Sequence, residues 1–83
     1  MIPVTKTVSE WLKNKSITPM MLTINIDSAS SVALRHAGYE LFRTDPDNEA
    51  DYARAADAYE EAERVFLDIH GNSKVTRQVE VAA

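Results

Sequence analysis

The stretch Tyr52–Ile69 reads YARAADAYEEAERVFLDI and decides the fold of this chain. Apolar side chains recur along it at intervals of three and four residues, which is the spacing of one face of an α-helix. The side chains on this face, which we name the long seam, are Tyr52, Ala55, Tyr59, Ala62, Phe66 and Ile69. We predict one continuous helix over residues 46–70 with the long seam turned inward. A seam of this length must be covered by another part of the chain or by a partner.

A shorter helix is predicted over residues 31–43, in front of the long one. The residues before it are of the types that cap helix N-termini, Asp27-Ser28-Ala29-Ser30-Ser31. Its apolar face consists of Leu34, Ala37, Leu41 and Phe42. Because only a short turn separates the two helices, they should pack as an antiparallel hairpin.

Four residues mark the boundaries and contacts of this hairpin. Asp45 can cap the long helix, and Pro46 suits its first turn. Gly71 is expected to end that helix in the left-handed conformation. Gly38 weakens the shorter helix by about 1 kcal/mol relative to Ala, but it permits a neighbouring helix to approach closely.

The remaining segments are predicted to be short. Thr7 and Glu10 have the spacing of a capping box, which predicts an N-terminal helix over residues 8–15. Residues 20–26 alternate between apolar and polar side chains, and residues 75–81 do so again. This alternation predicts two short strands, which can pair beside the hairpin.

Length and composition bound the fold. With 83 residues the chain forms a single domain over residues 1–83, and it buries only about 60% of its unfolded surface. It has no Cys for a disulfide, while its 45% hydrophobic and 27% charged residues are typical of globular proteins. We therefore expect an α+β, helix-dominated fold that relies on helix packing or oligomerisation for stability. The sequence shows neither a membrane span nor a secretory signal, so a cytoplasmic location is expected.

The charges are unevenly distributed. Residues 27–70 carry eleven acids against four bases, whereas residues 1–16 and 71–83 are slightly basic. An acidic middle repels phosphate and disfavours a broad nucleic-acid interface. A smaller nucleic-acid interface remains an alternative. It would use the basic side chains near the two termini, Lys6, Lys13, Lys15, Lys74 and Arg77.

The sequence contains no recognisable set of catalytic or metal-binding side chains. It has no Cys, and neither His36 nor His70 has a nucleophile beside it in a pattern that sequence can support. The acids of residues 45–51 lack the Gly and Glu that a calcium loop requires. With two Gly in the chain, a glycine-rich phosphate loop is not available. We expect no enzymatic activity, no metal and no cofactor.

One pattern resembles a known family. Tyr52-x2-Ala55-x3-Tyr59-x2-Ala62 follows a helix that contains Gly38, and it is similar to the second helix of a tetratricopeptide repeat. Proteins of that family form helical solenoids that bind peptides. The resemblance covers less than half of the chain, and such repeats need stacked neighbours. It implies a helical hairpin and not a repeat array.

The leading hypothesis is a non-enzymatic protein-interaction module, a small regulator or inhibitor that binds and modulates a larger protein. A short acidic chain with a long seam is typical of small inhibitors, antitoxin-like regulators and phage-encoded early proteins. The alternatives are an accessory subunit of an enzyme complex and a nucleic-acid-linked regulator that uses its basic termini. A homodimer is also expected, because the long helix extends beyond the short one and a two-stranded ribbon is marginal alone.

The candidate partner-binding residues are aromatic and basic side chains that the predicted core does not demand. They are Trp11, Arg35, Tyr39 and Arg43. Aromatic anchors usually dominate binding energy, and the arginines could face acidic groups. The competing interpretation is that Trp11 and Tyr39 cap the hairpin core, which would leave the acidic face of Asp57, Glu61 and Asp68 as the remaining candidate.

Overall fold

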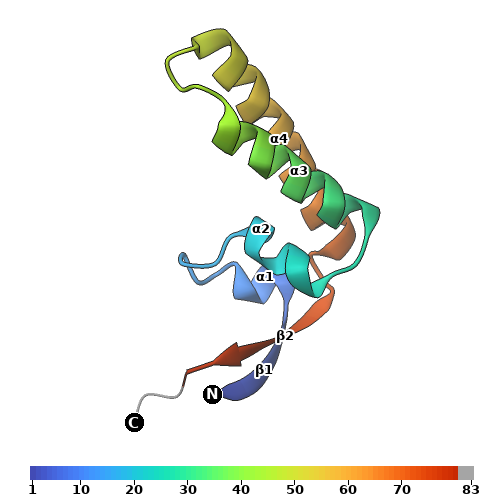
Figure 1. Cartoon of the computed structure of the whole chain (residues 1–83). Coiled ribbons are helices and arrows are strands. Elements are labelled where there is room, and N and C mark those ends of the chain that lie inside the picture. Colours follow the sequence, from blue (N-terminus) through green and yellow to red (C-terminus); the bar gives the residue numbers. More distant parts are fainter. Residues whose placement is uncertain (81–83) are drawn as a thin grey trace.

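The computed structural model describes residues 1–80 and confirms a helix-dominated α+β fold. A helical hairpin projects from a small body that ends in a two-stranded ribbon (Figure 1). The elements in chain order are β1 (Ile2–Thr7), α1 (Val8–Trp11), α2 (Pro19–Leu22), the 3-10 turn η1 (Thr23–Asn25), α3 (Ala29–Arg43), α4 (Glu49–His70) and β2 (Lys74–Val79).

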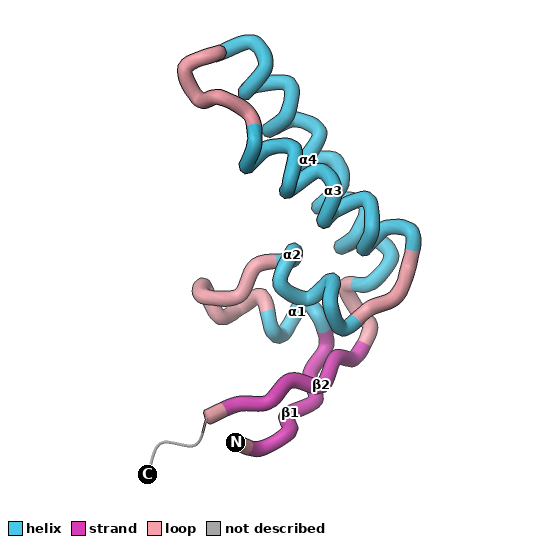
Figure 2. Tube along the Cα trace, viewed as in Figure 1, coloured by secondary structure: helices cyan, strands magenta, loops and turns pink. Residues whose placement is uncertain are grey.

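The hairpin of α3 and α4 is antiparallel, as predicted (Figure 2). The N-cap of α3 is Ser28, whose side chain accepts a hydrogen bond from the Ser31 amide. The long helix begins later than the predicted residue 46, because Asn48 caps it and accepts from the Asp51 amide. Asp45 instead holds the connecting turn, since its carboxylate accepts from the Asp47 amide at 2.9 Å.

Both glycines of the chain lie at close contacts. A Cβ atom at Gly38 would lie 2.5 Å from the Met20 sulfur and 3.5 Å from the Tyr59 ring. The close approach predicted at Gly38 is therefore present, but the nearest neighbour is a side chain of α2.

The predicted left-handed conformation of Gly71 is wrong. This residue has φ −52° and ψ −34°, which is right-handed. Its carbonyl accepts from the Ser9 amide at 3.0 Å and from the Ser9 hydroxyl at 2.8 Å. A Cβ at Gly71 would lie 2.7 Å from the Leu67 carbonyl oxygen and 3.3 Å from that hydroxyl oxygen. The glycine therefore permits close contacts both with the last turn of α4 and with α1.

The strand predicted over residues 20–26 is also wrong, because this segment forms α2 and η1. Thr18 caps α2, Pro19 occupies its first turn, and the Thr23 hydroxyl donates to the Met20 carbonyl at 2.7 Å. These local capping interactions outweigh an alternation of only a few residues.

The strand that pairs with β2 is β1, at the N-terminus. The two strands are antiparallel, with Val4 opposite Arg77 and Lys6 opposite Val75. Val75 on the inner face is buried, whereas the outer face carries polar pairs such as Thr5 and Thr76. The predicted strand over residues 75–81 is thus confirmed through Val79. The prediction is wrong for Glu80, which follows the end of β2, and residue 81 lies outside the described residues.

The N-terminal helix is shorter than the predicted range of 8–15. Thr7 caps this helix, because its hydroxyl accepts from the Glu10 amide. The predicted capping box is incomplete, since the Glu10 carboxylate accepts from the Thr7 hydroxyl and not from the Thr7 backbone amide. After Leu12 the chain continues as turns. The Lys13 amide donates to the Glu10 carbonyl, and the Asn14 amide donates to the Trp11 carbonyl. The regular α-helix α1 therefore ends at Trp11.

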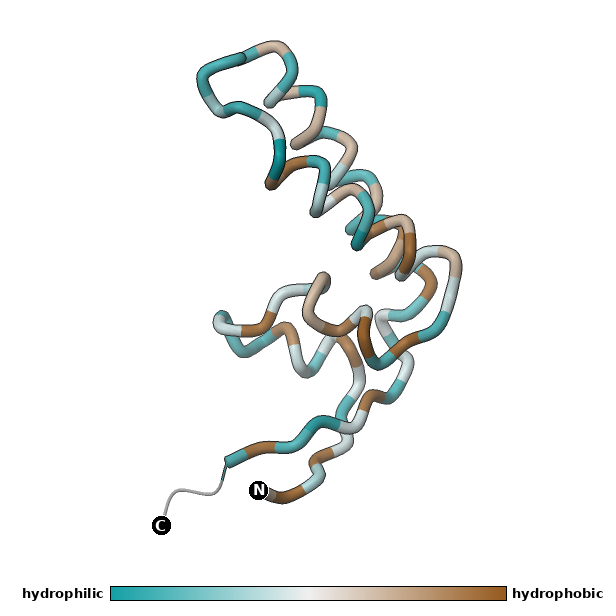
Figure 3. The backbone as a smooth tube through the Cα atoms, viewed as in Figure 1, coloured by the Kyte–Doolittle hydropathy of each residue, from teal (hydrophilic) through white to brown (hydrophobic). Residues whose placement is uncertain are grey.

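The core lies where the ribbon, α1, α2 and the base of the hairpin meet, and the connection at the hairpin tip is hydrophilic (Figure 3). Its buried apolar side chains are Val8, Trp11, Leu22, Leu34, Phe66 and Val75. The radius of gyration is 14.4 Å, while a compact domain of this length has one of about 12 Å. The hairpin tip therefore extends well beyond the core.

The long seam is inward in its middle and open at both ends. Phe66 is fully buried, and Ala55, Tyr59 and Ala62 are half-buried. The prediction that Tyr52 and Ile69 face inward is wrong, since both are exposed. His70 packs its ring 5.2 Å from that of Phe66 and ends the seam in place of Ile69. Among residues 1–80, none of the helices has the length and apolarity to cross a membrane.

Candidate functional site

The open part of the long seam forms one side of an apolar groove near the tip of the hairpin. Three helices and the α3–α4 connection build this hairpin groove, which encloses about 530 Å³. Its lining residues are Met20 from α2, Gly38, Leu41 and Phe42 from α3, Thr44 and Pro46 from the connection, and Tyr52 and Tyr59 from α4.

The spacing of residues on the two long helices explains why these side chains converge. Tyr52 and Tyr59 are seven residues apart, and Gly38 and Phe42 are four apart, so each pair shares a helix face. Because Gly38 has no side chain, the Met20 side chain packs directly against it, next to the Tyr59 ring. Phe42 is 89% exposed and Tyr52 is 42% exposed, which leaves two large aromatic side chains at the surface.

Tyr59 places a polar group among the aromatic side chains. Burial raises the pKa of its phenol above the ordinary value of 10.0, and the charge and hydrogen bonding of Glu63 raise it further. The phenol therefore stays protonated at neutral pH, and its one donor is directed to the Glu63 carboxylate. The groove is thus apolar, with the polar pair of Tyr59 and Glu63 at its α4 side.

Two acidic side chains lie along the α4 wall of the hairpin groove. Glu49 lies three residues before Tyr52 and Glu63 four residues after Tyr59, spacings that place both carboxylates on the same helix face as the rings. We name these two carboxylates, Glu49 and Glu63, the acidic rim. Asp45 adjoins the lining residue Pro46 in sequence but lines a separate hollow with Asn48 and Asp51.

The arginines near the hairpin tip already have acidic neighbours. Arg43 lies 3.9 Å from the Glu40 carboxylate, and Arg54 lies 3.8 Å from that of Asp51. Neither arginine is paired with a carboxylate of the acidic rim in these contacts. The negative charge around the groove is therefore not cancelled by them.

Trp11, one of the sequence-predicted binding residues, is a core residue. Its side chain is buried, and its indole nitrogen donates to the Val75 carbonyl at 2.9 Å. Lys6 and Arg77 approach the ring, with their charged groups 5.1 and 5.9 Å from its centroid. Trp11 thus joins the ribbon to α1, as the competing interpretation predicted, and lies outside the groove.

The other three predicted residues, Arg35, Tyr39 and Arg43, share the outer surface of α3. Val32, His36, Tyr39 and Arg43 recur at intervals of four, three and four residues and form one stripe. Tyr39 is more than half exposed, and a shallow hollow of about 330 Å³ is lined by Val32, Arg35, His36 and Tyr39. The structure therefore gathers these predicted residues on a second surface, separate from the groove.

The groove residues that sequence reasoning missed are Met20, Phe42 and Tyr52. Met20 was expected on a strand, while Phe42 and Tyr52 were expected inside the hairpin. One feature of the sequence did indicate an exposed apolar surface, because the long seam is longer than the short helix can cover. Which half stays uncovered depends on where α1 and α2 pack, and the sequence alone does not specify that.

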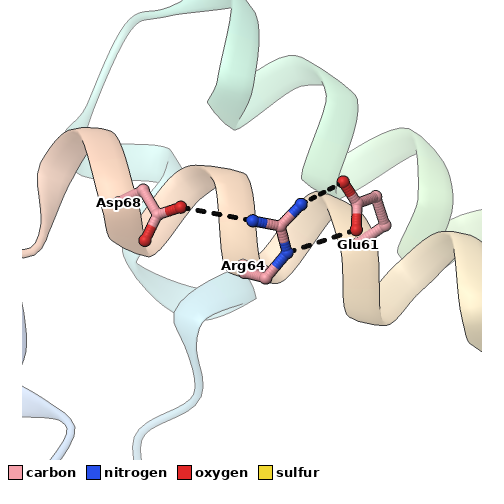
Figure 4. A network of polar contacts seen from close by, with 3 residues as sticks. All are labelled: Glu61, Arg64 and Asp68. Atoms are coloured by element: carbon pink, nitrogen blue, oxygen red, sulfur yellow. Dashed lines mark hydrogen bonds and ion pairs between the residues drawn. The ribbon is translucent and has the colours of Figure 1, made fainter.

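The outer face of α4 carries an ion-pair network (Figure 4). The Arg64 guanidinium contacts Glu61 through two nitrogens, one of them at 3.2 Å, and lies 3.5 Å from the Asp68 carboxylate. The hydrogen bond with Glu61, followed by its charge, raises the pKa of Arg64 above its ordinary value. All three side chains are exposed to solvent, so this network is a weak candidate for a binding site.

A histidine and two serines meet where α4 ends and α3 begins, which sequence reasoning also missed. One ring nitrogen of His70, Nε2, lies 2.9 Å from the hydroxyls of both Ser28 and Ser30. Ser28 additionally caps α3 by accepting from the Ser31 amide. This hydrogen bonding ties the two helix ends together. In the described range 1–80, His, Asp and Glu side chains form no cluster of three that could hold a metal ion.

Comparisons of the chain with protein-family models, with curated proteins and with solved structures find no match. The hairpin that the tetratricopeptide resemblance implied is present. The functional argument accordingly rests on the surfaces described above.

Proposed function

We propose that this chain is a non-enzymatic protein-interaction module, a small regulator or inhibitor that binds and modulates a larger protein through the hairpin groove. One observation carries the proposal. The long seam is fully buried at Phe66, yet at its other end Tyr52 and the neighbouring Phe42 are exposed in an apolar groove. A cytoplasmic location is part of this proposal.

The exposed apolar side chains of the groove support a binding role. Covering an aromatic side chain stabilises a complex by about 1.5–3 kcal/mol, and such anchors dominate binding energies. Two aromatic side chains beside Met20 and Leu41 therefore make the groove the most favourable surface for a partner.

A homodimer is the second part of the proposal, and the outer face of α3 is its proposed surface. Val32 and Tyr39 supply exposed apolar area there, beside Arg35 and His36. Pairing of two grooves is less favourable, since it would bring two acidic rims together.

The proposed function is tested by capture from cells that express the chain, followed by mass spectrometry. Wild type is compared with Phe42→Ala, in the groove, and with the matched control Ile24→Ala, which removes an exposed side chain that does not line the groove. We expect a partner that wild type and Ile24→Ala retain and Phe42→Ala loses. Equal retention by all three proteins would contradict the groove as the binding surface.

An accessory subunit of an enzyme complex would use the same groove. The identity of the captured partner separates this alternative from a regulator or inhibitor. An enzyme whose activity requires the chain would indicate an accessory subunit, whereas a partner whose activity the chain suppresses would indicate an inhibitor.

A nucleic-acid-linked regulator is a second candidate function, and the ribbon geometry favours it. The pairing of β1 with β2 places Lys6 and Arg77 on the same face of the ribbon, away from the acidic hairpin, and Lys74 on the opposite face. The cations of Lys6 and Arg77 both lie near the Trp11 ring. A salt-sensitive mobility shift with duplex DNA would support this candidate, and failure to bind at low salt would remove it.

A further inference from the structure

We propose that the hairpin groove binds an amphipathic helix of the partner that carries apolar anchors flanked by lysine or arginine. This inference rests on the proposed function and specifies the chemistry of the segment that is bound. It depends on three features of the described residues: the shape of the groove, its apolar lining and its acidic rim.

The geometry of α4 fits the repeat of a helical ligand. Tyr52 and Tyr59 are separated by about 10 Å along the helix axis, which is two turns. Apolar anchors at positions i, i+3 or i+4, and i+7 of a bound helix span the same distance. Two long walls, α3 and α4, and a third contact from Met20 of α2 bound the groove, which is the arrangement in which an added helix packs.

The charge of the rim selects a basic ligand. Glu49 and Glu63 share the helix face of Tyr52 and Tyr59, which line the groove. The nearby arginines Arg43 and Arg54 are engaged with other acids, at 3.9 and 3.8 Å. Lysine or arginine side chains that flank the apolar anchors would meet uncompensated carboxylates. Such complementarity speeds association and excludes acidic competitors.

The same charges argue against a second copy of this chain as the occupant. The segment that would have to enter the groove is another hairpin tip, because the exposed aromatic side chains are there. An isologous contact would place each acidic rim against the other. Like-charge contacts of this kind cost free energy that a basic segment avoids.

The test uses three synthetic peptides of about 18 residues, or five helical turns. The first has leucines at the spacing of one helix face and lysines elsewhere. The second replaces the lysines with glutamates, and the third replaces the leucines with serines. Each is titrated into the isotope-labelled full chain, and the amide chemical shifts are followed by NMR at low and at physiological salt.

We expect the leucine–lysine peptide to bind with shifts concentrated at Gly38, Phe42 and Tyr52, and to bind more weakly at higher salt. The leucine–glutamate and serine–lysine peptides should bind at least about tenfold more weakly, because each lacks one of the two recognition elements. Phe42→Ala should reduce the affinity of the first peptide by a similar factor, and Ile24→Ala should leave it unchanged.

Several results would overturn the inference. Equal affinity for the leucine–lysine and leucine–glutamate peptides would remove the charge preference, and equal affinity for the serine–lysine peptide would remove the apolar anchors. Shifts confined to the face of Glu61 and Asp68 would show non-specific charge binding. Self-association that Phe42→Ala abolishes would assign the groove to a second copy. If none of the peptides binds while cellular capture still depends on Phe42, the proposed function stands. Only the inference that the ligand is a basic amphipathic helix is then wrong.

Discussion

Tyr52 and Phe66 lie on the same face of α4, about four helical turns apart, yet Phe66 is completely buried and Tyr52 is 42% exposed. The difference arises because the body of the protein covers only the base of the hairpin. At the base, Val8, Trp11 and Leu22 join the core around Phe66. Nearer the tip, Met20 is the α2 residue that lines the groove. One seam therefore stabilises the fold at one end and offers a binding surface at the other.

Ala62→Asp should strongly destabilise the protein. Ala62 is half-buried and packs against the core, so an aspartate there would bury a charge at a cost of several kcal/mol. Glu61→Ala, on the adjacent solvent-exposed position, removes only a contact with Arg64 and should change stability little. Urea unfolding followed by circular dichroism compares the two variants. Similar tolerance of both changes would refute the assignment of helix faces.

Trp11→Phe should lower the free energy of unfolding by about 1–3 kcal/mol. The substitution keeps an aromatic ring in the core but removes the indole donor that bonds the Val75 carbonyl at 2.9 Å. Unfolding is followed by circular dichroism, because the chain has one Trp and the variant loses its fluorescence. Tyr39→Phe, on an exposed side chain, is the control. Unchanged stability of Trp11→Phe would contradict its placement in the core.

The protein should lose stability at alkaline pH in part through Tyr59. Its folded-state pKa is raised by burial and then by Glu63, so the folded state holds the phenol proton more tightly than the unfolded state does. This contribution is fully present below the ordinary pKa of about 10 and is lost as pH rises through the folded-state value. Tyr59→Phe should therefore show a smaller loss of stability above about pH 10. An identical alkaline profile for both proteins would show that Tyr59 does not contribute.

Sedimentation equilibrium at micromolar concentration should show a particle of about twice the 9.3 kDa chain mass. If the outer face of α3 forms this homodimer, Tyr39→Ser should dissociate it and Phe42→Ala should not. A concentration-independent monomer would refute the homodimer. Dissociation by Phe42→Ala would instead place the interface at the groove.

The hairpin was predictable because its signal is local. A three-and-four spacing over Tyr52–Phe66, preceded by a capped shorter helix, specifies two helices and a turn whatever surrounds them. The ribbon was only half predictable, since β1 pairs with a segment at the other end of the chain. The alternation of residues 20–26 wrongly predicted a strand, because Thr18 and Pro19 start a helix there.

The candidate site was less predictable for the same physical reason. Trp11 and Tyr39 look alike in sequence as aromatic residues on helices, and only the packing of the ribbon buries the first and leaves the second exposed. Phe42 has the spacing of a core residue, but no described residue of the small body reaches far enough along α3 to bury it. Exposure of an apolar side chain is set by the remote elements that do or do not cover it.

The most direct test of the central claim uses the two phenylalanines of the chain, which differ in burial and not in chemistry. The measurement is the free energy of unfolding of Phe66→Ala and Phe42→Ala relative to wild type. We expect Phe66→Ala to lose about 3–5 kcal/mol or to fail to fold, because it leaves a cavity in the core. Phe42→Ala should change stability by less than about 0.5 kcal/mol, as a surface substitution does. A large and equal loss in both variants would show that the groove is closed core in solution and would contradict the account.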